Sequence, residues 1–504
     1  MLKFVLIFVL CTKLTLAANI LLVPAEHGGH VNFFSNVGEI LSSKGGHNTY
    51  ILACPRQMKI LKKLKHVDTR FIIPEDICKD NPLIHMFSNI NDSDSSNPVS
   101  DFINKYPLMK KISTVVSKSS EHFLIEMLPK SNIKFDLVIV DGLDSFRTIY
   151  AIPLYLNLPY ITLHVRPDPW TFSVPAIPTN EGFLPLEILD ENSSLFARSL
   201  NTFAFLFTKY IFVTSLYDPT FVERLVPDVQ TNIDELVSKS AMILLNVDPI
   251  SCDFPPIETT NYKHLGSFGA RPGNLLSSPF KEFIDGADGG FVLVTFGSGI
   301  ATIPEYILNK ILTVASRIRQ RMVIRHKGVD PSRNYPENVM VNDWLPQNDL
   351  LAHPKCKVVV AHGGTSGQME SIFHGVPQVI IGFFGDQIYN GERAKKRKIG
   401  KSLDRFQFSA DDLQEAITDL MSEPYVSNIK KASEALKDLP NGADTVLFWT
   451  NHVLEFGGDH LRPMATDMPF YRVIMLDFIF IATVIIVSSL CITKIFLGKL
   501  LYKK

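Results

Sequence analysis

The chain has 504 residues, a formal net charge of −1 and 46% hydrophobic residues. This length is enough for two or more domains, each with its own core. The charge balance excludes proteins that bind nucleic acid through an overall positive charge, and the apolar content excludes a disordered chain.

The N-terminus reads "MLKFVLIFVLCTKLTLAAN". Lys3 precedes an apolar run that is too short to cross a bilayer, and small residues follow near Ala17. This order is typical of a secretory signal peptide, which we predict at residues 1–18. A buried first strand is the alternative, but the next run, "NILLVPA", already supplies that strand.

Apolar runs alternate with amphipathic segments through the first half. Residues 20–25 are predicted to form a buried parallel strand, and "VNFFSNVGEILSSKGGH" follows as a helix. The further predicted strands are "NTYILA", "FDLVIVDG" at 135–142 and "LPYITLH" at 158–164. The pattern predicts an α/β domain at residues 19–250 with a mainly parallel sheet.

A proline-rich and unusually apolar loop follows at residues 166–187. It either lines a pocket for a substrate or packs on the surface.

Two glycosylation sequons, at Asn91 and Asn192, predict that this half faces the lumen or the exterior. The four cysteines outside the two apolar ends are widely spaced and lack the pattern of a zinc site. They are Cys54, Cys78, Cys252 and Cys356. Disulfides are compatible with a lumenal location, but the sequence does not specify their pairing.

Residues 251–281 are rich in Pro, Gly and Ser, so we predict a linker there. The alternation then restarts and predicts a second α/β domain at 282–460. Its predicted strands are 291–298, 321–326, 357–364 and 378–387, with a helix that begins near Pro304. Two such sheets predict a cleft between domains, with ligands at the carboxyl ends of the strands.

The C-terminus predicts a transmembrane helix at residues 473–493, followed by a tail at 494–504 with four lysines. Because positive charge stays cytosolic, we expect a single-pass type I protein with a lumenal body. The final Lys503 and Lys504 suggest retrieval to the endoplasmic reticulum, although their spacing is not the usual one.

The segment "AHGGTSGQMESIFHGVPQVIIGFFGDQ" at 361–387 places His362, Gly363 and Gly364 where a predicted strand ends and a helix begins. Free N–H groups and the positive helix end suit a diphosphate there, and "TFGSG" could add Ser298. A catalytic centre, or a strand and helix that merely pack well, are the alternatives.

The longer run "WLPQNDLLAHPKCKVVVAHGGTSGQMESIFHGVPQVIIGFFGDQIYN" at 344–390 resembles the signature of the UDP-glycosyltransferases. The resemblance extends to an early histidine, "FDLVIVD", "LFWTNHVLEFGGDHLRP" and the C-terminal span, and so covers nearly the whole chain. It implies a GT-B fold, in which two Rossmann-like domains face a cleft.

The resemblance also implies roles for individual residues. Trp344 would stack on uracil, Gln347 would bind near the base, and Glu370 would accept hydrogen bonds from the ribose. The diphosphate would contact Ser298, His362 and the backbone of Gly363, Gly364, Ser366 and Gly367, and the sugar hydroxyls would contact Asp386 and Gln387. Ser366 departs from the family, which often has Asn there. His374 is interpreted as structural.

His30 stands at the position of the family's catalytic base and Asp141 at that of its partner carboxylate. A histidine with a pKa near ~6.5 can accept a proton from a hydroxyl, and a carboxylate sets its tautomer. From the residues alone, a structural histidine or a metal-binding pair with His27 stays open. His27 is the alternative base.

The implied reaction is an inverting transfer of a sugar to a small lipophilic acceptor, with the UDP-sugar as co-substrate and without a metal. Glucuronosyl members place an Arg where Leu245 stands, so we favour UDP-glucose. The alternatives are glucuronosyl transfer, glycosylation of a lipid head group, and a membrane protein that binds nucleotide sugars without turnover. A homo-oligomer is left open.

Overall fold

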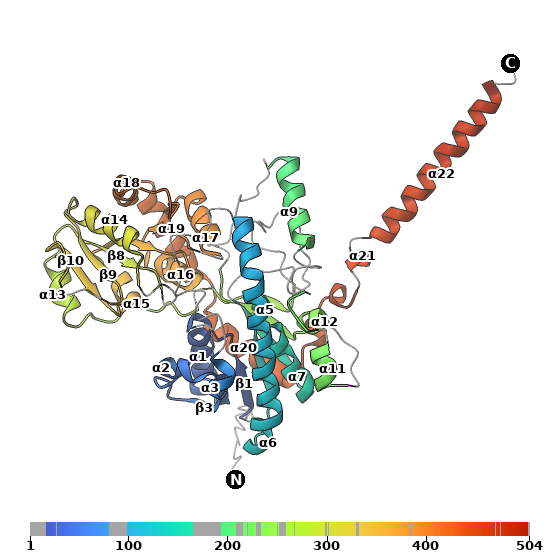
Figure 1. Cartoon of the computed structure of the whole chain (residues 1–504), viewed down its shortest axis with the longest axis horizontal. Coiled ribbons are helices and arrows are strands. Elements are labelled where there is room, and N and C mark those ends of the chain that lie inside the picture. The colour runs from blue at the N-terminus through green and yellow to red at the C-terminus, as the bar shows by residue number, and fades with distance from the viewer. Residues whose placement is uncertain are drawn as a thin grey trace, which may run out of the picture.

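The structure is a computed structural model, and it describes residues 17–501 with internal gaps. The gaps are 27, 80–97, 165–192, 208–214, 219, 228–232, 249, 251–258, 267, 298–299, 301, 329–331, 384–385, 469 and 474. Within the described residues, two parallel sheets of seven and six strands are each flanked by helices (Figure 1). This arrangement is a pair of Rossmann-like domains, as predicted.

The first sheet has the strand order β3-β2-β1-β4-β5-β6-β7, and all neighbours are parallel. Its strands are β1 (Asn19–Val23), β2 (Asn48–Ala53), β3 (Val67–Ile72), β4 (Leu137–Asp141), β5 (Tyr160–His164), β6 (Met242–Leu245) and β7 (Tyr262–His264). The central strands are buried on both faces, which explains why they read as continuous apolar runs.

The first half of the chain also contains helices, most of which pack around the first sheet. They are α1 (Gly28–Ser43), α2 (Met58–Leu61), α3 (Glu75–Cys78), α5 (Pro98–His122), α6 (Leu128–Ser131), α7 (Ala151–Leu156), α11 (Thr220–Leu225), α12 (Ile233–Ser238) and the largely exposed α9 (Leu195–Phe207). The strand β1, which precedes α1, pairs with β4 in parallel, so the carboxyl ends of these two strands lie side by side.

The second sheet has the order β10-β9-β8-β11-β12-β13, again wholly parallel. Its strands are β8 (Phe291–Thr295), β9 (Arg321–Arg325), β10 (Val339–Asn342), β11 (Cys356–Ala361), β12 (Gln378–Ile380) and β13 (Gly400–Ser402). Its helices are α13 (Phe280–Asp285), α14 (Glu305–Ala315), α15 (Gln347–Leu351), α16 (Thr365–His374), α17 (Asp386–Lys396), α18 (Ala410–Leu420) and α19 (Tyr425–Asp438).

The helix α20 (Gly442–Phe456) returns from the second half of the chain to the first sheet. It lies beside α1 (Figure 1), and its Val446 and Val453 belong to the apolar core between α1 and that sheet. The imidazole of His47 joins the two parts: its Nδ1 accepts from the Ala18 N–H at 3.3 Å, and its Nε2 lies 2.8 Å from Asn451 Oδ1. The last helix of the second half therefore helps to fix the first half.

The predicted linker also contributes to the sheet, since β7 lies within residues 251–281 and pairs with β6. Cys54 and Cys78 form a disulfide, which the sequence left unassigned. Glu26 lies beside these sulfurs, but a disulfide provides no thiolate ligands for a metal.

The short helix α21 (Phe470–Val473) precedes α22 (Leu476–Leu501), which projects from the body (Figure 1). Within α22, Leu476–Gly498 is long and apolar enough to cross a membrane, and it is exposed over its apolar length. The span begins and ends a few residues later than the predicted 473–493. The signal segment before residue 17, both sequons, Cys252 and the loop 166–187 lie outside the described residues.

Candidate functional site

His30 and Asp141 are brought together by neighbouring strands, as predicted. Asp141 is the last residue of β4, and His30 lies in the first turn of α1, just after β1. The His30 Nδ1 lies 2.8 Å from Asp141 Oδ2. The carboxylate is fully buried and also accepts from the N–H groups of Ala25 at 3.0 Å and Leu143 at 3.1 Å, so its orientation is fixed.

The pKa values of this pair follow from burial and mutual charge. Burial alone would lower the pKa of His30, but the charge and hydrogen bond of Asp141 raise it above its ordinary value, with a smaller contribution from Asp386. Burial acts to raise the pKa of Asp141, but the charge and hydrogen bond of His30 hold it below its usual range. The contribution of Asp386 shows that this residue of the second half lies near His30.

In the second half, His362 lies between two glycine turns. A Cβ added at Gly297 would lie 2.6 Å from the ring carbon Cε1 of His362, and one at Gly364 would lie 2.5 Å from its Nε2. The turn that follows β8 therefore meets the start of α16, where the sequence predicts a diphosphate site. Ser298 itself lies outside the described residues.

His362 is electrically neutral at neutral pH. Burial lowers its pKa to about 4, and among the described residues its Nδ1 has no hydrogen-bond partner. A buried polar atom without a partner at a helix N-terminus fits a site that a ligand completes. Gly363 has a φ of +84°, and a Cβ there would lie 2.7 Å from Ile380, so only glycine fits at this position.

Two residues predicted to contact the nucleotide, Gln347 near the uracil and Glu370 at the ribose, are joined by hydrogen bonds at the carboxyl ends of the strands. Thr295 donates to Gln347 Oε1 at 3.1 Å, and the amide nitrogen of Gln347 donates to Glu370 Oε2 at 2.7 Å. Burial raises the pKa of Glu370 although this hydrogen bond opposes the rise. Trp344 is 60% exposed, so the face of its indole is accessible for stacking.

The two predicted sugar ligands differ in their surroundings. Asp386 opens α17, and its Oδ2 accepts from Thr365 at 2.9 Å and from Asn390 at 3.0 Å. Gln387 is buried, and its side-chain oxygen accepts from the Phe383 N–H at 2.9 Å, so that oxygen is already used within the protein.

Ser366 and Gly367 occupy the first turn of α16, and Ser366 is exposed. His374 ends this helix. Its Nε2 lies 3.1 Å from Asn348 Oδ1 in α15, and burial lowers its pKa to about 4, which agrees with its interpretation as structural.

Sequence reasoning missed Arg325, which ends β9 beside the turn after β8. Its guanidinium donates to the Gly297 carbonyl and is near enough to His362 to help lower the pKa of that residue. The available signal was a cation at the carboxyl end of a predicted strand, next to a glycine turn.

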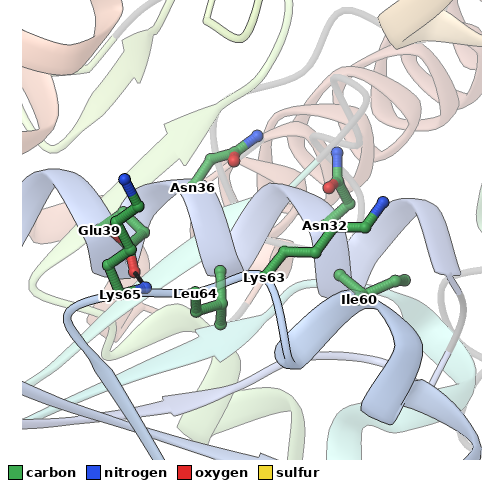
Figure 2. A pocket seen from close by; sticks show the side chains of 7 residues that line it. All are labelled: Asn32, Asn36, Glu39, Ile60, Lys63, Leu64 and Lys65. Atoms are coloured by element: carbon green, nitrogen blue, oxygen red, sulfur yellow. Dashed lines mark hydrogen bonds between the residues drawn. The ribbon is translucent and has the colours of Figure 1, made fainter.

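A separate hollow of about 350 Å³ lies on the outer face of α1, between Asn32, Asn36, Lys63 and Lys65 (Figure 2). It contains none of the predicted site residues, so we place the candidate site at the carboxyl ends of the strands of the two sheets.

Solved glycosyltransferases share this fold. The chain matches a glycosyltransferase of kitacinnamycin with a TM-score of 0.59 and 17% identity over 86% of this chain and 99% of that one. A UDP-glucosyltransferase from Polygonum tinctorium matches with a TM-score of 0.59 and 15% identity over 87% and 99%. Two parallel Rossmann-like domains with these structural neighbours define a GT-B fold.

The chain belongs to the UDP-glucuronosyl and UDP-glucosyl transferase family, whose model matches residues 18–503. It is 27% identical to human UDP-glucuronosyltransferase 1A1 over 95% of this chain and 90% of that protein. It is 31% identical to rat UDP-glucuronosyltransferase 1-2 over 71% and 67%. UDP-glycosyltransferase UGT4 of Dactylopius coccus is 28% identical over 75% and 76%.

Proposed function

We propose that this UDP-glycosyltransferase transfers glucose from UDP-glucose to a hydroxyl of a small lipophilic acceptor, with inversion at the anomeric carbon. The hydrogen-bonded His30 and Asp141 are the observation that carries the proposal. Because Nδ1 of His30 faces Asp141, its Nε2 is the nitrogen that accepts the proton.

In the proposed step, Nε2 of His30 takes the acceptor's hydroxyl proton while the oxygen attacks the anomeric carbon. The bond between that carbon and the UDP oxygen breaks, and UDP leaves with the electron pair. The free N–H groups at the start of α16, together with His362 and Ser298, stabilise the departing diphosphate. Asp141 stabilises the imidazolium that forms.

Leu245 supports glucose over glucuronate as the transferred sugar. This residue is fully buried at the end of β6 and carries no charge to pair with a carboxylate. Several relatives are named as glucuronosyltransferases, so glucuronosyl transfer is the alternative. A comparison of turnover with UDP-glucose and UDP-glucuronate distinguishes the two.

We further propose that α22 anchors the protein in the endoplasmic reticulum membrane, with both sheets in the lumen and the lysine-rich tail in the cytosol. The disulfide Cys54–Cys78 supports an oxidising compartment. No metal or other cofactor is part of the proposed reaction.

Replacement of His30 tests the proposal. His30→Ala should reduce transfer at least about 10²-fold, because the proposed base for the acceptor proton is lost, while UDP binding by calorimetry stays unchanged. The exposed His66→Ala serves as the matched control and should retain full activity. Undiminished transfer by His30→Ala would rule out this residue as the base.

A further inference from the structure

The carboxylate of Asp386 lies at the N-termini of two helices. It belongs to the first residue of α17, and its Oδ2 lies 2.9 Å from the Oγ1 of Thr365, the first residue of α16. Both helix ends carry a partial positive charge, which attracts negatively charged groups. The same end of α16 is the expected diphosphate site, so Asp386 lies where the nucleotide meets the sugar.

Two buried side chains hold one oxygen of this carboxylate. Thr365 is 8% exposed and Asn390 is 2% exposed, and both donate to Oδ2. Asn390 is itself fixed, because its amide nitrogen also donates to the Gly363 carbonyl at 2.8 Å and its oxygen accepts from Arg393. The network leaves Asp386 little freedom to rotate.

The other oxygen, Oδ1, has no donor among the described residues. Because two donors hold Oδ2, the orientation of Oδ1 is set as well. A carboxylate oxygen suits a sugar hydroxyl. We propose that Thr365 is a positioning residue for donor recognition: its hydroxyl orients Asp386 so that Oδ1 binds a hydroxyl of the transferred sugar. This inference rests on the proposed function and deepens it.

The hydroxyl of Thr365, and not its volume, is what the proposal requires. Asn390 alone cannot fix the carboxylate of Asp386, because the carboxylate could still rotate about its one remaining hydrogen bond, from Asn390 to Oδ2. Removal of the hydroxyl should therefore weaken the contact with the sugar but leave the contacts with uracil, ribose and diphosphate intact, since those use other residues.

The test compares the binding of UDP-glucose and UDP by calorimetry, using the full chain in detergent. Thr365→Val keeps the side-chain shape and removes the hydroxyl. We expect it to weaken UDP-glucose binding about tenfold, as for the loss of a hydrogen bond to a charged group, and to leave UDP binding unchanged. Thr365→Ser should restore UDP-glucose binding. Thr313→Val is the matched control, because the Thr313 hydroxyl donates to the Asn309 carbonyl within the exposed face of α14.

A double variant tests whether Thr365 acts through Asp386. In the background of Asp386→Ala, Thr365→Val should cause no further loss of UDP-glucose binding. Equal losses for UDP and UDP-glucose, an additive loss in the double variant, or unchanged binding by Thr365→Val would each overturn the inference. A wild-type protein that binds no UDP-sugar would contradict the proposed function and the inference together.

Discussion

At the scale of single residues, Asp141 controls both the tautomer and the basicity of His30. Its Oδ2 faces the Nδ1 of His30, and the backbone donors of Ala25 and Leu143 prevent it from turning away. Because burial alone would lower the pKa of His30, the rise depends on the negative charge of Asp141.

Asp141→Asn should therefore change the pH dependence of transfer as well as its rate. The active form of His30 is deprotonated, so activity rises with pH through its pKa. Loss of the negative charge should move this acid limb of the kcat/KM profile to lower pH. The plateau should fall about 10³–10⁴-fold, because the amide no longer selects the tautomer or stabilises the cation.

The profile is measured for both proteins under identical conditions, and UDP affinity reports whether the second half stays intact. An acid limb that stays in place or moves to higher pH would show that Asp141 does not set the basicity of His30.

The proximity of His30 to Asp141 was predictable because both follow recognisable strands, and Gln347 and Glu370 occur at a fixed spacing in a family motif. The contacts of Arg325 and Thr365 were not predictable, since they join turns that are distant in the sequence. Arg325 approaches Gly297, and Thr365 approaches Asp386, only after the sheet has formed.

At the scale of elements, the sequence pattern predicts where many strands lie in the chain, but it does not predict where the helix α20 packs. The sequence predicts the strands β1, β2, β4, β5, β8 and β9 to within a few residues, because buried parallel strands are continuous apolar runs. It does not reveal that α20 packs on the first sheet, because an amphipathic pattern identifies a buried face but not the surface that covers it.

Two substitutions on α20 test this docking. Val453→Asp would bury a carboxylate without a partner in the core shared with α1, and should lower stability by several kcal/mol. Phe448→Asp changes the opposite, exposed face and should have an effect within about 0.5 kcal/mol. Thermal unfolding in detergent measures both. Equal shifts in Tm would contradict the docking of α20 against the first sheet.

At the scale of the whole molecule, the candidate site draws residues from both sheets. The proposed base is on the first sheet and the candidate donor site on the second, and the charge of Asp386 acts on His30 across the boundary. The helix α20 connects the two halves a second time, in addition to the linker. The second half therefore carries the candidate donor site and also packs against the half that holds the proposed base.

The helix α22 contributes to neither sheet, because its apolar length is exposed and its main neighbour is α21. Removal of residues 474–504 should therefore separate anchoring from ligand binding. The truncated protein should leave the membrane fraction on alkaline carbonate extraction, whereas the full chain should remain there. UDP affinity of the soluble form should match that of the detergent-solubilised full chain within about twofold, because the residues of the donor site lie on the second sheet. A truncated protein that stays in the membrane would show that another surface of the body also inserts, and one that loses UDP affinity would show that the span supports the donor site.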